Sequence, residues 1–145
     1  MTTPVPMCPV VHFEMPYQDR ERAARFYAAV FGWTHQMMGP EMGEYLLVNT
    51  VENGPRPGVP PEAPVAAIHG GLYPKDPASP IQHPSVVIAV ENIHAAMARV
   101  QAAGGQVLGE PMTIPGVGEY VAFEDTEGNR NSIIQPSMGD QSCAS

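Results

Sequence analysis

Hydrophobic and polar residues alternate along the segment that follows the first nine residues. In Val10-Val11-His12-Phe13-Glu14-Met15, every second residue from Val11 is apolar, and Pro16 follows. This alternation predicts a strand with one apolar face, which ends at the proline. His12 and Glu14 then lie together on the opposite face.

A helical spacing replaces the alternation over residues 20–31. Its apolar positions are Ala23, Phe26, Tyr27, Val30 and Phe31. The pattern predicts one helix, with Asp19 as its N-cap and Gly32 as its stop. We expect Phe26 and Tyr27 of this helix to pack inside the fold.

The same order of elements returns later in the chain. Strands are predicted at 33–38, 44–49 and 65–73, followed by a strand at 85–90, a helix at 93–103, and strands at 106–112, 119–123 and 131–135. The helices and the strands before them superpose at an offset of 73 residues. The chain therefore reads as an α+β protein with two βαβββ modules. A proline-rich segment, residues 55–64, lies in the connection before the fourth strand.

The composition and net charge of the chain argue against several kinds of partner and location. The chain has 145 residues, a net charge of −8 and a pI of about 4.9. This charge argues against nucleic acid and anionic membrane surfaces as partners. No stretch is long and apolar enough to span a bilayer, and residues 1–9 lack the pattern of a signal peptide. We expect a cytoplasmic protein in which Cys8 and Cys143 are free thiols, with a disulfide as the alternative.

Several motifs, in their order along the chain, resemble one family. They are Val11-His12-Phe13-Glu14, Phe26-Tyr27 with Phe31-Gly32-Trp33, Gly70-Gly71-Leu72, and Asp125-Thr126-Glu127-Gly128-Asn129. Together they resemble the vicinal oxygen chelate superfamily, which includes glyoxalases, bleomycin-resistance proteins and extradiol dioxygenases. The family usually has proline where Thr126 stands.

The resemblance implies eight strands in curled mixed sheets around a cavity, with one helix behind each sheet. It covers residues 10–136 as a single domain, with modules at 10–74 and 83–136, a flexible leader at 1–9 and a flexible tail at 137–145. Many members are dimers, so we expect a homodimer that binds a small molecule.

Metal-dependent members of the family hold a divalent ion with four side chains. Those positions fall on His12, near Gly71 with His69 two residues earlier, on Ser85 and on Ser132, so His12 is the one clear ligand and His69 is a second candidate. We therefore expect no usual metal site and no usual glyoxalase I activity. The alternative is a displaced site with His12, Glu14 and His69 as ligands, serving a lyase, an isomerase or a dioxygenase.

Three hypotheses follow for the function. The first is a protein that binds a small, partly apolar or aromatic compound without a cofactor, either to sequester it or to act on it by acid–base chemistry. The second is the metal-dependent enzyme with the displaced site, and the third is a non-catalytic interaction module. In the first, His12 and Glu14 are the catalytic candidates. The candidate ligand contacts are Trp33, Tyr45, His69, Tyr73, Ser85, Tyr120 and Ser132.

Overall fold

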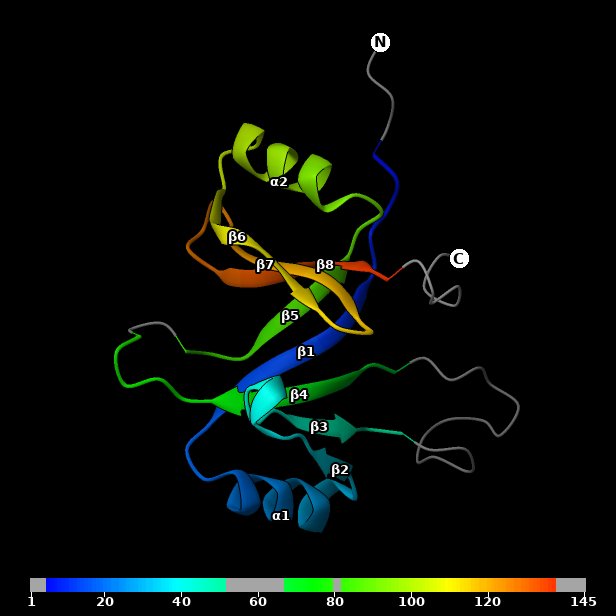
Figure 1. The fold of residues 1–145 in the computed structure, drawn as a ribbon, viewed down its shortest axis with the longest axis vertical. Coiled ribbons are helices and arrows are strands. Elements are labelled where there is room, and N and C mark those ends of the chain that lie inside the picture. The colour runs from blue at the N-terminus through cyan, green and yellow to red at the C-terminus, as the bar shows by residue number, and fades with distance from the viewer. Residues whose placement is uncertain (1–4, 52–66, 80–81, 138–145) are drawn as a thin grey trace, which may run out of the picture. The chain divides into compact units, whose positions relative to one another are not determined.

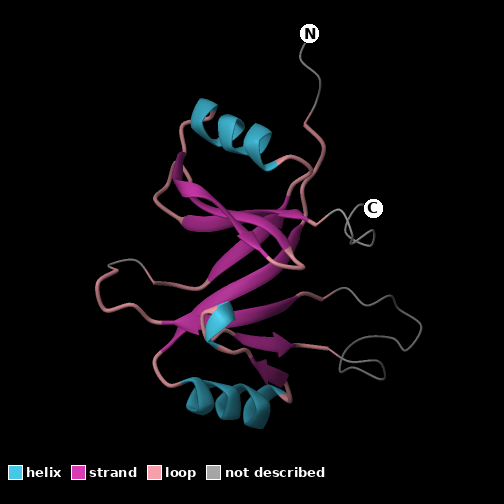
Figure 2. Cartoon of the chain, viewed as in Figure 1, coloured by secondary structure: helices cyan, strands magenta, loops and turns pink. Residues whose placement is uncertain are grey.

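The computed structural model describes residues 5–51, 67–79 and 82–137. The first half of the chain contains β1 (Val10–Tyr17), α1 (Arg20–Phe31), β2 (Thr34–Met37), the short 3₁₀ helix η1 (Pro40–Met42), β3 (Leu46–Asn49) and β4 (His69–Pro74) (Figure 1). The second half contains β5 (Ser85–Ala89), α2 (Ile93–Ala102), β6 (Gln106–Ile114), β7 (Gly118–Glu124) and β8 (Arg130–Pro136) (Figure 2). The predicted α+β order is confirmed, and the described helices are too short to cross a membrane.

The chain divides into two compact units. The N-terminal unit comprises residues 12–84, and the C-terminal unit comprises residues 85–145 together with 1–11. In the first, the strand order is β2-β3-β4-β1, with β1 parallel to β4. In the second it is β5-β8-β7-β6, with β5 parallel to β8. The same topology therefore occurs twice.

Each helix covers one face of its own sheet. In the N-terminal unit, Leu46, Val48 and Leu72 form a buried cluster with Ala24 of α1, and Phe13 packs against it. In the C-terminal unit, the corresponding cluster includes Ile93 and Ala96 of α2 and Val121 and Ile133 of the sheet. Because strand residues alternate between faces, the neighbours of these residues lie on the face that the helix does not cover. We call this the open face of each unit.

Two consecutive glycines in β4 make room for aromatic rings. A Cβ atom at Gly70 would overlap the ring of Phe13, and one at Gly71 would overlap the ring of Tyr45. The glycines are adjacent in the strand, so Phe13 lies on the helix-covered face and Tyr45 on the open face.

The duplication extends to the register of the strands. Glu14 pairs with Gly71 in the N-terminal unit, and Val87 pairs with Ser132 in the C-terminal unit. The tyrosines match as well, because Tyr45 lies two residues before the partner of Gly71 and Tyr120 two residues before the partner of Ser132. The two units thus place a tyrosine at the same position relative to the strands.

The helix ends agree with the sequence prediction. The Asp19 carboxylate accepts a hydrogen bond from the backbone N–H of Arg22 at 3.0 Å, and Asn92 caps α2 in the same way. Gly32 ends α1 in the left-handed conformation, with φ of 75°.

Two local predictions are wrong. β1 does not end at Met15 but runs through Pro16 to Tyr17. The carbonyl of Tyr17 accepts a hydrogen bond from the backbone N–H of Lys75 next to β4, so the nitrogen of Pro16 points away from β4 and its missing N–H costs no bond to that strand. Phe26 was predicted to pack inside, yet its side chain is exposed.

Several predictions concern residues that lie outside the described part of the chain. These are residues 1–4 of the leader, the 55–64 segment and residues 138–145 of the tail, with Cys143.

We predict that Gly70→Ala lowers the free energy of unfolding by about 1–3 kcal/mol, the usual cost of overpacking a core. The added methyl group meets the Phe13 ring, which is held against Trp33. Urea unfolding followed by the fluorescence of Trp33, the single tryptophan, measures the change.

Gly39→Ala is the matched control, because its added methyl group meets only the flexible Glu41 carboxylate. Equal unfolding midpoints for the two variants would contradict the role of Gly70.

Candidate functional site

Three polar side chains meet on the open face of the N-terminal unit. Nε2 of His12 lies 2.9 Å from the Tyr45 hydroxyl, which donates a hydrogen bond of 2.9 Å to Oε2 of Glu14. All three side chains are half-buried. We call this set the His12–Tyr45–Glu14 triad.

The hydrogen bonds fix the positions of the protons. The Tyr45 hydroxyl has one hydrogen, which goes to the Glu14 carboxylate, so this oxygen must accept from His12. Nε2 of His12 therefore carries a proton. In a neutral imidazole the other nitrogen, Nδ1, then keeps its lone pair and can act as a base.

Burial favours the neutral form of the His12 ring. Desolvation lowers the pKa of His12 below 6.5, because the charged imidazolium is penalised away from water. The Glu14 carboxylate opposes this shift, and the neighbouring His69 lowers the pKa further.

A short irregular turn places Tyr45 in the triad. Gly43 and Glu44 both have left-handed backbones, with φ of 66° and 54°. The Tyr17 hydroxyl donates to the carbonyl of Glu44 at 2.8 Å, and the N–H of Met38 donates to the carbonyl of Tyr45. Sequence reasoning missed Tyr17 and Glu44, and the Gly43-Glu44 pair at the start of the strand predicted over 44–49 was the available signal.

His69 lies beside the triad. It is the register partner of His12 across β1 and β4, so both imidazoles lie on the open face. The backbone N–H of Thr50 donates to Nδ1 of His69 at 3.0 Å. In the neutral ring, Nε2 of His69 consequently carries the proton and presents a hydrogen-bond donor.

The other predicted ligand contacts divide between the two faces and the two units. Tyr73 follows Gly71 by two residues in β4 and lies on the open face of the N-terminal unit. Trp33 does not, because its ring stacks on Tyr27 at 4.7 Å and packs against the helix-covered core. The structure therefore does not bring Trp33 to the triad.

The C-terminal unit has a simpler polar pair. Ser132 is only 3% exposed, and its hydroxyl donates to that of Tyr120 at 2.7 Å. Ser85 begins β5 and is half-buried. Tyr120 thus has a serine as its partner, whereas Tyr45 has a histidine and a glutamate.

The sequence and the fold can be compared with those of known proteins. The family described as Glyoxalase/Bleomycin resistance protein/Dioxygenase superfamily matches residues 10–133. The chain belongs to this superfamily. The resemblance predicted from the sequence motifs is confirmed.

Relatives in this superfamily carry glyoxylase names. The provisionally named glyoxylase CFP32 of Mycobacterium tuberculosis is 34% identical over 115 residues, which are 79% of this chain and 39% of that protein. The chain thus spans about two fifths of the curated mycobacterial relatives it matches. A glyoxylase-like domain-containing protein of Didymella fabae is 32% identical over 83% of this chain and 88% of that protein.

Solved structures share the fold at low sequence identity. A hypothetical protein of Bacillus halodurans has a TM-score of 0.64 at 13% identity, over 90% of this chain and 95% of that one. Methylmalonyl-CoA epimerase of Mycobacterium tuberculosis has a TM-score of 0.61 at 16% identity, over 94% of this chain and 91% of that one.

The residues at the superfamily's metal positions do not fit a metal ion. Gly71 has no donor atom, and the Tyr45 ring fills the space beside it. Ser132 is buried in a hydrogen bond to Tyr120, and Ser85 offers only a neutral hydroxyl. His12 is the single good ligand at these positions.

The side chains of the alternative metal site, His12, Glu14 and His69, are not arranged as ligands around one ion. The Tyr45 hydroxyl bridges His12 and Glu14, and the proton on Nε2 of His69 occupies the nitrogen that would bind. Across residues 5–51, 67–79 and 82–137, no three His, Cys, Asp or Glu side chains are grouped as metal ligands would be. Metal content itself stays a prediction.

We predict that long-range ¹⁵N spectra of His12 show a proton on Nε2 and none on Nδ1, with a titration midpoint below 6.5. The Tyr45 acceptor sets the tautomer, and burial sets the direction of the pKa shift. Tyr45→Phe removes the acceptor and is expected to lose the tautomer preference.

The lowered pKa of His12 predicts how the stability of the fold depends on pH. In the unfolded chain His12 takes up a proton with a pKa of about 6.5, whereas in the folded chain it does so only at a lower pH. The free energy of unfolding should therefore hold above pH 6.5 and fall as the pH drops below it. His12→Gln should flatten this fall, and an unchanged pH profile would contradict the assignment.

Proposed function

We propose that the open face of the N-terminal unit binds a small, partly apolar organic compound through an oxygen atom and transfers a proton to or from it. The observation that carries this proposal is the Tyr45 hydroxyl, 2.9 Å from both His12 and Glu14. A half-buried carboxylate, hydroxyl and imidazole in one hydrogen-bonded chain is the arrangement of a working acid–base group.

The order of the hydrogen bonds suits His12 to the role of base. When Nδ1 of His12 takes a proton, the ring becomes positive and its Nε2–H bond to Tyr45 strengthens. The Glu14 carboxylate stabilises this positive charge through the Tyr45 hydroxyl, which donates a hydrogen bond to it. Glu14 and Tyr45 are then positioning residues, and His12 is the group that meets the compound.

His69 and Tyr73 supply the means to bind. The Nε2–H of His69 is a donor for a carbonyl or carboxylate oxygen, and its Nδ1 is held by Thr50. Tyr73 adds aromatic surface on the same face for a planar or apolar part of the compound.

The names of the relatives fit this class of compound. CFP32 and the Didymella fabae protein are called glyoxylases or glyoxylase-like, and one neighbour in structure is an epimerase of methylmalonyl-CoA. We extend to this chain only what these names share, which is action on a small acyl or carbonyl compound. If His12 binds the compound but transfers no proton, the protein sequesters the compound without changing it.

We predict that Tyr45→Phe and Glu14→Gln each weaken binding of the best compound from a thermal-shift panel of carbonyl, carboxylate and aromatic compounds. Loss of one hydrogen bond in the triad should lower the affinity about tenfold or more, which corresponds to roughly 1.4 kcal/mol. Calorimetric titration measures the affinity of each variant.

Tyr27→Phe is the matched control, because the Tyr27 hydroxyl has only a 3.8 Å contact with the sulfur of Met15 on the helix-covered side. Absence of any hit in the panel, or an equal effect of Tyr27→Phe, would overturn the proposal.

We also predict that the purified protein contains well under one equivalent of Ni, Zn, Mn or Fe per chain, because the four superfamily positions offer one imidazole. Elemental analysis tests this, before and after incubation with each ion. One equivalent that His12→Gln abolishes would instead support the metal-dependent enzyme. The predicted cytoplasmic location and the state of Cys8 and Cys143 stay predictions.

A further inference from the structure

The connection between β2 and β3, residues 38–45, brings Tyr45 to the triad. A backbone hydrogen bond of 2.8 Å closes its two ends, in which the N–H of Met38 donates to the carbonyl of Tyr45. Between these ends lie η1 and the left-handed residues Gly43 and Glu44. We call residues 38–45 the Tyr45 loop. The direction of the Tyr45 side chain depends on what holds this loop to the rest of the N-terminal unit.

Two side chains next to the short connection between β1 and α1 hold the Tyr45 loop. Arg20, the first residue of α1, donates from Nη1 to the carbonyl of Met38 at 2.8 Å. Tyr17, the last residue of β1, donates from its hydroxyl to the carbonyl of Glu44 at 2.8 Å. The loop is therefore bonded near each of its ends to one side of the sheet.

These bonds fix the peptide groups on both sides of Tyr45. The carbonyl before it, that of Glu44, accepts from Tyr17. Its own carbonyl accepts from Met38, which Arg20 holds in turn. Because each peptide group is planar, fixing both of them fixes the direction in which the Tyr45 side chain leaves the backbone. The ring then has only its side-chain torsions left to choose.

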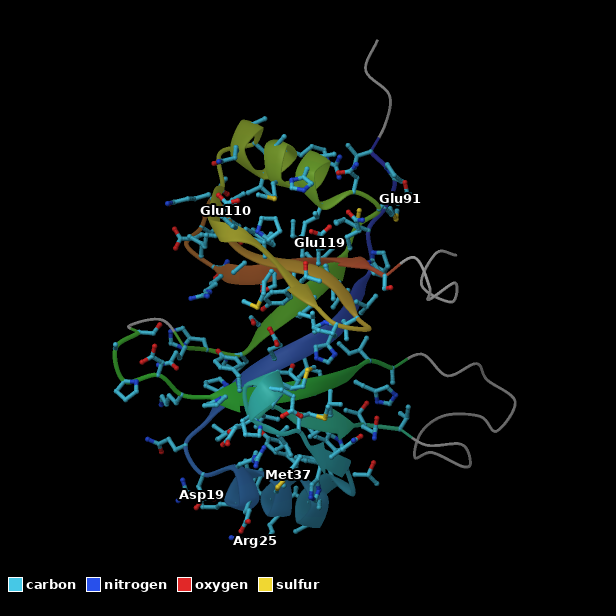
Figure 3. All side chains as sticks on the ribbon, in the orientation of Figure 1. Asp19, Arg25, Met37, Glu91, Glu110 and Glu119 are labelled. Atoms are coloured by element: carbon cyan, nitrogen blue, oxygen red, sulfur yellow. The ribbon has the colours of Figure 1, made fainter. Side chains whose placement is uncertain are left out.

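The two supporting residues belong to the helix-covered side of the sheet, whereas the triad lies on the open face. Tyr17 packs against the buried cluster of the N-terminal unit, and Arg20 begins the helix that covers it. Figure 3 labels Asp19, the N-cap just before Arg20, and Met37, the residue just before Met38. Arg20 and Tyr17 therefore act on the triad through the Tyr45 loop.

Both supporting groups are donors at neutral pH. A guanidinium has N–H donors and no acceptor, so Arg20 can only donate to the carbonyl. Burial raises the pKa of the Tyr17 hydroxyl, although the charge of Arg20 lowers it, and Glu44 adds to the rise. The hydroxyl consequently keeps the hydrogen that it donates.

We propose that Arg20 and Tyr17 are positioning residues, which hold the Tyr45 hydroxyl against His12 and Glu14 before a compound binds. The inference rests on the proposed function only for the step in which the triad meets a compound. A site whose groups are already in place loses less conformational entropy on binding. Removal of either donor lets the Tyr45 loop open, and the Tyr45 hydroxyl then leaves Nε2 of His12 for part of the time.

Long-range ¹⁵N spectra of His12 test the proposal in the protein without a compound. Tyr17→Phe and Arg20→Met each remove one support and keep most of the side-chain bulk. Each should move the His12 signals toward those of Tyr45→Phe. The ratio of the Nε2–H form to the Nδ1–H form should fall about threefold or more, which is the size of effect expected for one hydrogen bond.

A double variant shows whether the effect passes through Tyr45. Tyr17→Phe should cause no further change in a chain that already carries Tyr45→Phe, because the acceptor for His12 is then absent. An equal change of the His12 signals with and without Tyr45→Phe would contradict the proposal.

Tyr27→Phe and Arg22→Gln are the matched controls, because they remove a hydroxyl and an exposed charge from the same unit. Both should leave the His12 signals unchanged, and circular dichroism checks that every variant is folded. The two supports are tested separately, so either variant can be interpreted without the other. His12 signals that stay at their wild-type positions in Tyr17→Phe and in Arg20→Met would overturn the proposal. A compound panel without a hit would count against the proposed function alone, because these spectra need no compound.

Discussion

The absence of side chains at two positions of β4 determines how the N-terminal unit is built. Gly70 leaves space for Phe13 on the helix-covered face, and Gly71 leaves space for the Tyr45 ring on the open face. The first ring joins the packing around Trp33 and α1. The second carries its hydroxyl to His12 and Glu14. The packing of the core and the geometry of the site therefore depend on neighbouring residues of one strand, and a substitution at Gly70 or at Gly71 would affect both.

Much of this fold could be predicted because local signals and packing agree. The alternation through β1 placed His12 and Glu14 on one face, and the caps at Asp19 and Asn92 set both helix starts. The triad could be predicted only in part. Its hub, Tyr45, depends on a left-handed turn and on a bond from Tyr17 that is distant in sequence. Such contacts have no periodicity, so a single sequence does not reveal them.

The errors have physical reasons of the same kind. Phe26 was expected inside because it is aromatic and lies at helical spacing, but the sheet covers the side of α1 that carries Ala23 and Ala24. Hydrophobic spacing predicts which residues share a helix side, and it does not say what covers that side. Trp33 was expected at the site for its ring, and it is instead stacked on Tyr27.

The matched register of the two units has an evolutionary consequence. Glycine at position 71 lets Tyr45 lie over β4 and reach β1, whereas serine at the equivalent position 132 keeps Tyr120 in a bond to β8. After the duplication of an ancestral module, an exchange between glycine and serine at this position, together with Glu14 in one repeat and Val87 in the other, would have given the two tyrosines their different partners.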